Sequence, residues 1–356
     1  MRAVSFQKVG QALAIVDVAA PVATATDLVV RVQCCGICGS DLHLTEVHET
    51  SGGMAPMLPG TIMGHEFCGE VLEVGDALRD RWHAGDRITA LPYVGCGVCR
   101  ACLNGLGHRC PQVRYCGLGN LPGAYAEFMR VGGAEALRLP AGVDWQRGAL
   151  VEPLAVGLHV VHVARLVPGE TVLVLGAGPI GLTVALWCRY FGAHQVIVCD
   201  KVPARLALAE RMGATGTIDA NRENVVDRFK RLAGARPDVV IECIGVPGTQ
   251  QLAMNYAPAG GRVVIVGVCM APDTVLPVKA ISKELQVNYV FMYRKRDFEI
   301  TLDLLDRGRI DPTPMLTRSV SFDEFPSAFE ALKTDKSACK VWLEPWKNAP
   351  HSARLE

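Results

Sequence analysis

The sequence predicts an α/β protein in which a β-rich part precedes a doubly wound parallel sheet. Short alternating apolar stretches bounded by Gly, Pro or Asp fill residues 1–150, as is typical of strands and turns. From Val151 onward, apolar runs alternate with segments of helical spacing, and this rhythm predicts a parallel sheet covered by helices on both faces. Half of the 356 residues are hydrophobic, which is ample for buried cores.

Strands in the first part are predicted from alternating apolar and polar residues. They are LVVRVQ (28–33), GEVLEVG (69–75), DRITALPY (86–93) and AYAEFMRV (124–131). The loops between these strands carry nearly all the Cys and His of this part. We therefore expect its chemistry to lie in the loops.

The second part begins with a helix and continues as strand–helix units. The helix is predicted at 152–166, the strands at 171–176, 195–200, 238–245 and 262–268, and one further helix at 298–308 among mixed strands. The uncharged stretch Thr171–Cys188 is long enough to suggest a membrane span. Three glycines and a proline in its middle favour a buried strand followed by a helix instead.

Charge and cysteine content exclude several classes of function. Lys plus Arg and Asp plus Glu each total 36, so neither a nucleic acid nor an anionic membrane is an expected partner. The start, MRAVSFQKVG, has no apolar secretory segment. We expect a cytoplasmic protein whose fourteen cysteines are core residues, nucleophiles or metal ligands.

The strongest motif is C-x2-C-x2-C-x7-C at Cys96, Cys99, Cys102 and Cys110. Four thiolates on one short loop suit a tetrahedral structural zinc site, which leaves no coordination position open for chemistry. An iron–sulfur cluster and unliganded core thiols are the alternatives. The sequence therefore predicts a zinc that holds a loop together.

The second motif is GAGPIG, with Gly176, Gly178 and Gly181. It closes an apolar strand and opens a helix, as the Rossmann dinucleotide fingerprint requires, so Pro179 and Ile180 are also expected at the phosphates. The next strand ends 19 residues after Gly181 at Asp200, which suits a hydrogen bond from the adenosine ribose 2′-OH of NAD. Arg205 is expected to contact the adenosine half, or else to be a solvated helix residue.

A further metal site is suggested by scattered ligand types. The stretch CCGICGSDLH supplies Cys38, the segment IMGHEF supplies His65 and Glu66, and VEPLAV supplies Glu152. One cysteine, a histidine and an acid can hold a zinc that keeps one exchangeable position. Such a zinc beside a nicotinamide could polarise an alcohol before hydride leaves.

These motifs in this order resemble the zinc-dependent medium-chain alcohol dehydrogenases, on the sorbitol and threonine dehydrogenase branch. The resemblance rests on CGSDLH, GHE, the four-cysteine loop, EPLAV, GAGPIG with Asp200, and VIVGV. It implies a GroES-like β catalytic domain over 1–150 and 294–356, with a Rossmann domain inserted over 151–293. Cys34 and Cys35 are then core or surface thiols, and the CxxC formed by Cys35 and Cys38 is not a redox pair.

The resemblance implies a role for each matching residue. Cys38 and His65 would be fixed zinc ligands, with Glu66 or Glu152 as the third contact, directly or through water. Ser40 would hydrogen-bond the alcohol, His43 would pass the proton outward, and Asp41 would orient His65. Further cofactor contacts are expected at Cys243, Gly267 and Val268, whereas His159 and His162 are expected to be structural.

The predicted function is reversible oxidation of an alcohol by NAD, with one catalytic and one structural Zn²⁺ (EC 1.1.1.-). Where sorbitol dehydrogenases hold polyol hydroxyls, this chain has Leu44 and Met292 beside Tyr293, so we expect a fairly apolar secondary alcohol. Met54, Met57 and Leu58 are candidates for the pocket entrance. A polyol or amino-alcohol substrate and a catalytically silent NAD-binding regulatory protein are the alternatives. The retained ligand set and Asp200 argue against a zinc-free quinone reductase.

A homo-oligomer is also expected from the resemblance, a tetramer or else a dimer. The apolar strand VVIVGV and the segment Leu276–Ile281 are the candidate contacts.

Overall fold

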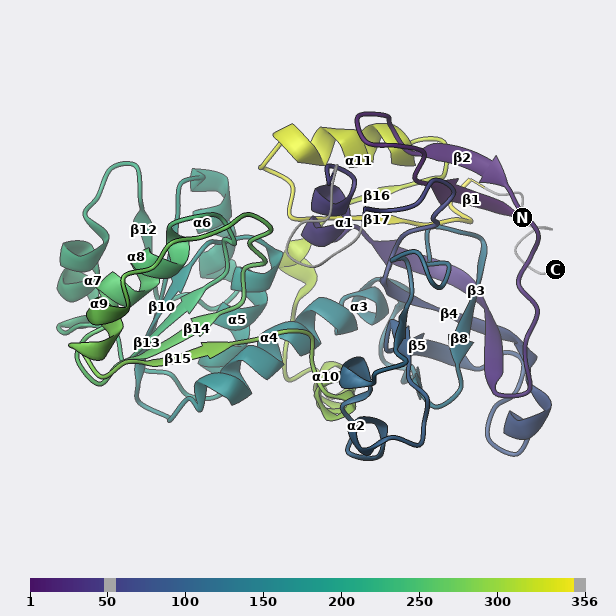
Figure 1. Cartoon of the computed structure of the whole chain (residues 1–356), viewed down its shortest axis with the longest axis horizontal. Coiled ribbons are helices and arrows are strands. Elements are labelled where there is room, and N and C mark those ends of the chain that lie inside the picture. Colours follow the sequence, from purple (N-terminus) through teal and green to yellow (C-terminus); the bar gives the residue numbers. More distant parts are fainter. Residues whose placement is uncertain (48–55, 349–356) are drawn as a thin grey trace.

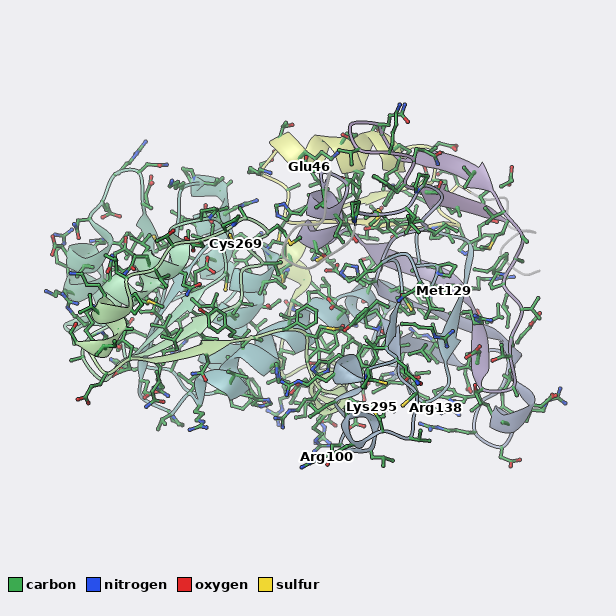
Figure 2. The ribbon with its side chains drawn as sticks, viewed as in Figure 1. Glu46, Arg100, Met129, Arg138, Cys269 and Lys295 are labelled. Atoms are coloured by element: carbon green, nitrogen blue, oxygen red, sulfur yellow. The ribbon has the colours of Figure 1, made fainter. Side chains whose placement is uncertain are left out.

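The computed structural model describes residues 1–47 and 56–348, and the chain forms two lobes (Figure 1). One lobe is built around a mostly antiparallel sheet, and the other around a parallel sheet. In Figure 2, Cys269 lies in the parallel-sheet lobe and Met129 in the other. The predicted loop residue Met54 lies outside the described residues.

The first lobe centres on a seven-stranded sheet in the order β16-β17-β3-β4-β5-β9, with β8 paired to β3. Its strands are β3 (Asp27–Gly36), β4 (Glu66–Val74), β5 (Arg87–Ala90), β8 (Phe128–Gly132), β9 (Ala136–Arg138), β16 (Leu316–Val320) and β17 (Lys340–Leu343). Two further two-stranded sheets pair β1 (Arg2–Ser5) with β2 (Ala14–Asp17), and β6 (Tyr93–Val94) with β7 (Arg114–Tyr115). Most of β3 is buried on both faces, so it forms the centre of this core.

Short helices and turns surround this sheet. They are α1 (Gly39–Leu44), η1 (Asp76–Leu78), α2 (Arg100–Leu103), η2 (Gly107–Arg109), α3 (Trp145–Ala149), η3 (Thr313–Met315) and α11 (Phe325–Thr334). Helix α1 follows β3 directly, and α11 covers the same end of the lobe (Figure 1). The end of β3 and the start of β4 therefore lie next to a helix that can carry functional side chains.

The second lobe contains six parallel strands in the order β12-β11-β10-β13-β14-β15. They are β10 (Thr171–Leu175), β11 (Gln195–Asp200), β12 (Gly216–Asp219), β13 (Val239–Glu242), β14 (Arg262–Ile265) and β15 (Gln286–Tyr289). This is the 3-2-1-4-5-6 order of a Rossmann sheet, whose ligands bind beyond the carboxyl ends of the strands. Sequence patterns missed β12 and β15, which are short and only partly buried.

Helices cover this sheet. They are α4 (Val151–Ala164), α5 (Pro179–Tyr190), α6 (Pro203–Arg211), α7 (Val225–Ala233), α8 (Thr249–Tyr256) and α9 (Pro277–Ile281), while α10 (Lys295–Asp306) packs on α4. The uncharged stretch 171–188 forms β10 and α5 rather than one helix. Within the described part of the chain, no helix is both long and apolar enough to cross a membrane.

The chain returns to the first lobe after the parallel sheet. β17 pairs with β3 so that Trp342 lies opposite Gly36, and β16 pairs with β17. The predicted fold class, a GroES-like lobe with a Rossmann lobe, is confirmed, while the limits at 150 and 294 stay predictions. The strand VVIVGV is mostly interior, because β14 lies between β13 and β15, so its buried valines cannot form an oligomer contact.

Candidate active site

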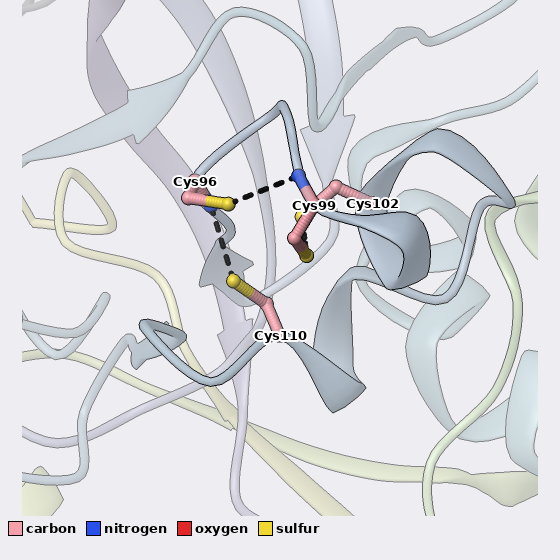
Figure 3. A group of neighbouring side chains, drawn as sticks. All are labelled: Cys96, Cys99, Cys102 and Cys110. Carbon is pink, nitrogen blue, oxygen red and sulfur yellow. Dashed lines mark hydrogen bonds between the residues drawn. The ribbon is translucent and has the colours of Figure 1, made fainter.

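The four predicted cysteine ligands converge on one point of the loop that carries α2 and η2 (Figure 3). Their sulfur atoms all lie within 4.8 Å of one another. Backbone N–H groups point at the sulfurs: Cys96 N is 3.3 Å from Cys110 Sγ, and Cys99 N is 3.4 Å from Cys96 Sγ. N–H donors favour thiolates, which are the form that binds zinc.

The ionisation of these thiols fits a metal centre. Hydrogen bonds from the backbone N–H groups of Val98 and Cys99 lower the pKa of Cys96 to about 6. Burial raises the pKa of Cys102 to about 12, and hydrogen bonds with the neighbouring thiols Cys99, Cys110 and Cys96 act in the same direction. A metal-free cluster therefore cannot ionise fully, and a divalent cation would remove that conflict. The residues fit a closed zinc site.

The second candidate cluster joins Cys38, His65 and Glu66, whose ligand atoms also lie within 4.8 Å of one another. Cys38 stands between β3 and α1, while Glu66 opens β4 opposite Gly36 of β3. The antiparallel pairing of β3 with β4 therefore brings the distant segments together. Thiolate, imidazole and carboxylate form a zinc donor set that leaves a position open.

A buried acid orients the histidine. Asp41 is fully buried, and its Oδ1 lies 3.3 Å from His65 Nδ1, which leaves Nε2 for a metal. Its Oδ2 accepts hydrogen bonds from Tyr125 Oη (2.5 Å) and Cys38 N (3.1 Å). Burial raises the pKa of Asp41, but His65 and these hydrogen bonds outweigh it and lower that pKa. Asp41 therefore stays ionised beside His65, as expected; Tyr125 was not foreseen.

Glu66 has a partner that sequence reasoning missed. The Lys340 ammonium group on β17 contacts both carboxylate oxygens of Glu66 and lies 3.3 Å from Ile37 O. Both side chains of the pair are almost fully buried. The lysine balances the charge of a carboxylate that would otherwise be isolated from water. The sequence offered one signal for this pair: a lysine begins the otherwise apolar stretch KVWL, and a buried lysine needs an acidic partner.

Glu152 lies near the cluster but outside the group of ligand atoms within 4.8 Å. It is 7% exposed at the start of α4, and burial raises its pKa to about 7. The Tyr293 hydroxyl lies close enough to influence that pKa, although it makes no hydrogen bond of normal geometry. Cys38, His65 and Glu66 thus come together directly, and Glu152 lies nearby but outside this group.

The other predicted catalytic and pocket residues lie on two segments. Ser40 and His43 are three residues apart on α1, with Ser40 half-buried and His43 exposed. Leu44 is half-buried at the end of the same helix. Met292 is half-buried with φ +58°, a left-handed conformation that is unusual for a residue with a side chain.

The glycine motif has the geometry of a phosphate-binding turn. A Cβ on Gly181 would lie 1.8 Å from Gly176 O, whereas one on Gly178 would meet nothing within 4 Å. Gly178 caps α5, with Pro179 and Ile180 in its first turn. The close approach at one glycine and the open space at another suit a pyrophosphate at a helix N-terminus.

Asp200 ends β11 beside this turn. Its carboxylate accepts hydrogen bonds from Ala177 N (2.7 Å) and Val202 N (2.8 Å), so it holds the glycine loop in place. Arg205 crosses to the other lobe, where its Nε donates to Lys336 O at 2.9 Å. Thus Arg205 bridges the lobes here, which the sequence did not suggest.

The remaining cofactor candidates lie at neighbouring strand ends. Cys243 follows β13, and Gly267 and Val268 follow β14. The buried Glu242 accepts hydrogen bonds from Ile244 N (2.7 Å) and Gly245 N (2.9 Å), which fixes the loop after β13. These residues lie at the carboxyl ends of central strands, where dinucleotides bind.

The other thiols of the opening motif are packed into cores. Cys34 and Cys35 are buried on β3, and Cys34 pairs with Cys68 across β3 and β4. Burial raises the pKa of both Cys34 and Cys35 well above the usual value. They therefore stay protonated, as expected for core residues.

Comparison with known proteins agrees with this geometry. Residues 24–141 match the family described as the alcohol dehydrogenase GroES-like domain, and residues 179–307 match the family described as zinc-binding dehydrogenase. Sorbitol dehydrogenase of Bacillus subtilis (strain 168) is 31% identical over 324 residues, covering 90% of each chain. L-threonine 3-dehydrogenase of Aeromonas salmonicida (strain A449) is 31% identical over 338 residues, covering 95% of this chain and 97% of that one.

The chain belongs to the zinc-dependent medium-chain alcohol dehydrogenases. A zinc-binding dehydrogenase from Sinorhizobium meliloti 1021, solved with NADP, has a TM-score of 0.86 and 35% identity, covering 97% of this chain and 99% of that one. An alcohol dehydrogenase from Escherichia coli CFT073, solved with NADH, has a TM-score of 0.88 and 28% identity over the same shares. This medium-chain dehydrogenase is therefore a zinc-dependent, NAD(P)-binding oxidoreductase of class EC 1.1.1.-, acting on alcohols or polyols.

Proposed function

We propose that this medium-chain dehydrogenase uses NAD to oxidise fairly apolar secondary alcohols to ketones. The proposal rests on the positions of the two polar residues that follow Met292, which are Tyr293 and Arg294. Tyr293 is fully buried, and Arg294 lines a surface groove of about 700 Å³ with Arg100 and Arg109 beside the four-cysteine loop. Neither side chain offers polarity to a substrate at Met292. A polyol there would leave hydroxyls unpaired, at about 1–3 kcal/mol each.

The residues around the open site have distinct tasks in this reaction. Zinc held by Cys38 and His65, with Glu66 or Glu152 as third contact, would supply a Lewis acid that lowers the pKa of the alcohol hydroxyl. Ser40, half-buried on α1, would take the hydroxyl proton as it passes its own proton on to His43, and the hydride would go to NAD. His43, one turn further and exposed, hands that proton to water. Asp41 keeps His65 in the orientation that binds metal.

NAD is the proposed cofactor because of Asp200. Its carboxylate can accept from a ribose 2′-OH, a charged hydrogen bond worth roughly 1.5–3 kcal/mol. A 2′-phosphate would face the same negative charge, although Lys201 next door could soften the repulsion. The related proteins were solved with either NADP or NADH, so the preference needs a direct test. If Asp200→Ala keeps the wild-type ratio of kcat/KM for NAD over NADP, this account is wrong.

The substrate proposal is tested by ranking alcohols. Cyclohexanol should exceed sorbitol and threonine in kcat/KM, and Met292→Arg should narrow that gap. A tenfold advantage for sorbitol or threonine would instead favour the polyol or amino-alcohol alternative, which the names of the two related dehydrogenases support. If no alcohol yields NADH or NADPH, the result would favour the alternative of a catalytically silent, NAD-binding regulatory protein.

We further propose a cytoplasmic homotetramer, or a dimer, that works without nucleic acid or membrane partners. Support for self-association comes from the edge of the parallel sheet, where β15 is the last strand. Leu276, Val278, Ile281 and Tyr289 are 56%, 62%, 72% and 66% exposed there. Apolar side chains gathered beside a free strand edge suit a contact between copies. Light scattering that shows a monomer at micromolar concentration would overturn this part.

A further inference from the structure

A buried carboxylate joins two histidines behind the candidate site. Asp297, in the first turn of α10, is 1% exposed. Its Oδ2 lies 3.0 Å from His159 Nδ1, and its Oδ1 lies 3.0 Å from His162 Nδ1. Both histidines belong to α4, three residues apart. We call these three residues the Asp297 clamp.

The clamp is made of an ionised acid and two N–H donors. Burial raises the pKa of Asp297, but hydrogen bonds from His159 and His162 and from Arg294 N outweigh it and hold that pKa well below its usual value. Each histidine therefore presents Nδ1–H to the carboxylate. Hydrogen bonds to a buried charge are stronger than neutral ones, so the clamp fixes α10 firmly against α4.

The same carboxylate also fixes the start of α10. Asp297 Oδ2 accepts from Arg294 N at 2.8 Å, which satisfies a free N–H at the helix start. Tyr293 immediately precedes this cap, and its ring packs on Phe298 at 4.9 Å between centroids. One side chain therefore sets where the chain leaves the turn at Met292 and enters the helix.

This geometry links the clamp to the candidate site. Glu152 and His159 are seven residues apart on α4, which is two turns, so both face the same way. Tyr293 directly precedes the N-cap Arg294, and Asp297 lies in the first turn of α10, the helix that packs on α4. Asp297 meets His159 while the buried Tyr293 hydroxyl lies toward Glu152. Holding Asp297 on His159 therefore restrains where the Tyr293 side chain lies relative to Glu152.

The turn itself needs such support. Met292 holds a left-handed φ of +58°, which a side chain disfavours. Strain of this kind persists only where the surroundings determine the backbone on both sides. On one side β15 pairs with β14, where Tyr289 lies opposite Ile265. On the other side, the Asp297 clamp fixes the backbone through the hydrogen bond from Arg294 N.

We propose that Asp297, His159 and His162 are positioning residues that hold the Met292–Tyr293 turn against Glu152, and thereby set the geometry of the open zinc site. The inference rests on the proposed alcohol oxidation at that site. It assigns a task to two histidines on α4 and to a buried acid that the chemistry itself does not use.

The test compares two substitutions of His159. His159→Leu removes the donor at similar size, and should lower kcat/KM for the preferred alcohol about ten- to a hundred-fold, mainly through kcat, as a misplaced group does. His159→Asn keeps an N–H near the Nδ1 position and should stay within about threefold of wild type. The matched control is Thr301→Val, which removes the hydrogen bond from Thr301 Oγ1 to Asp297 O (2.7 Å) but spares the carboxylate. It should leave the kinetics unchanged.

A double-mutant cycle separates positioning from general destabilisation. In a Tyr293→Phe background, His159→Leu should cost less than about threefold, since both act through one contact. Fully additive losses, or equal losses in His159→Leu and Thr301→Val, would overturn the proposal. The rate at which a chelator removes the zinc of the open site is the second readout, and His159→Leu should raise it. If wild type oxidises no alcohol, the proposed function fails, and an unchanged release rate would then overturn the clamp separately.

Discussion

The two candidate zinc sites differ in where along the chain their ligands come from. The closed site takes all four ligands from one stretch of chain, residues 96–110, and orders them with that stretch's own backbone N–H groups. The open site takes its ligands from the end of β3 and the start of β4, with Glu152 on α4 behind them. Three of its candidate ligands have a supporting neighbour: Asp41 beside His65, Lys340 at Glu66 and the Tyr293 hydroxyl near Glu152.

Because of this difference, we expect the closed site to serve the stability of the fold and the open site to serve catalysis. A site that completes its own coordination can only hold its loop together. A site assembled from distant segments keeps room for a substrate, but it requires the surrounding fold to hold every ligand in place. The closed site should therefore respond to substitution by unfolding, and the open site by losing activity.

The largest contrast is expected at Cys38. Cys38→Ser removes a ligand of the open site, and loss of a Lewis acid worth several kcal/mol should lower kcat roughly a thousandfold or more. The melting temperature should change little, since Cys38 is the N-cap of the short helix α1 and serine can cap a helix in its place. Metal analysis should still find the zinc of the four-cysteine loop. A variant that keeps a tenth of wild-type activity would contradict this assignment of the site.

The opposite response is expected at Cys96. Cys96→Ser breaks the closed site, and the free energy of unfolding should fall by about 4 kcal/mol or more, as metal-site losses do. The folded fraction should retain near-normal kcat, because this loop holds no substrate-binding position. Denaturant unfolding and active-site titration measure the two quantities. Unchanged stability with lost activity would reverse the roles of the two sites.

Sequence reasoning found the candidate ligands and Asp41, but not the more distant residues that support them. Cys38, His65 and the four-cysteine loop stand in motifs whose residue types and spacing are set by coordination chemistry, so one sequence suffices to find them. Lys340, Tyr125 and Asp297 each lie far along the chain from the residue that they hold. The partners of Lys340 and Asp297 follow from β17 pairing with β3 and from α10 packing on α4, which no local pattern encodes.

Sequence patterns also predicted only part of the secondary structure. The long apolar runs that became β10, β11, β13 and β14 were predicted, because buried central strands are apolar on both faces. The strands β12 and β15 lie at the sheet edges, where partial exposure weakens the pattern. The helix α11 was missed too, because the last segment was expected to hold only one helix and strands.

A moderate effect should appear in the pH dependence of the metal-free protein. Burial raises the pKa of Glu152 to about 7 in the folded state, above its unfolded value, so folding favours the protonated acid. The contribution of Glu152 to stability is therefore greatest below about pH 4.5 and falls by roughly 2–3 kcal/mol as the pH rises to about 7. Glu152→Gln should remove this part of the loss between pH 5 and pH 8. An equal pH dependence in wild type and variant, measured by urea unfolding, would exclude a buried Glu152.

The smallest effects come from one added methyl group at each site. Gly97 has φ +77° with nothing within 4 Å of its missing Cβ, so Gly97→Ala should cost only backbone strain, about 1 kcal/mol. A Cβ on Gly36 would lie 2.3 Å from Glu66 Oε2, so Gly36→Ala must displace that carboxylate. We expect Gly97→Ala to lower stability and leave metal retention at the open site unchanged. Gly36→Ala should instead speed release of that zinc to a chelator severalfold. Identical behaviour of the two variants would mean that Glu66 has no part in holding the open site's metal.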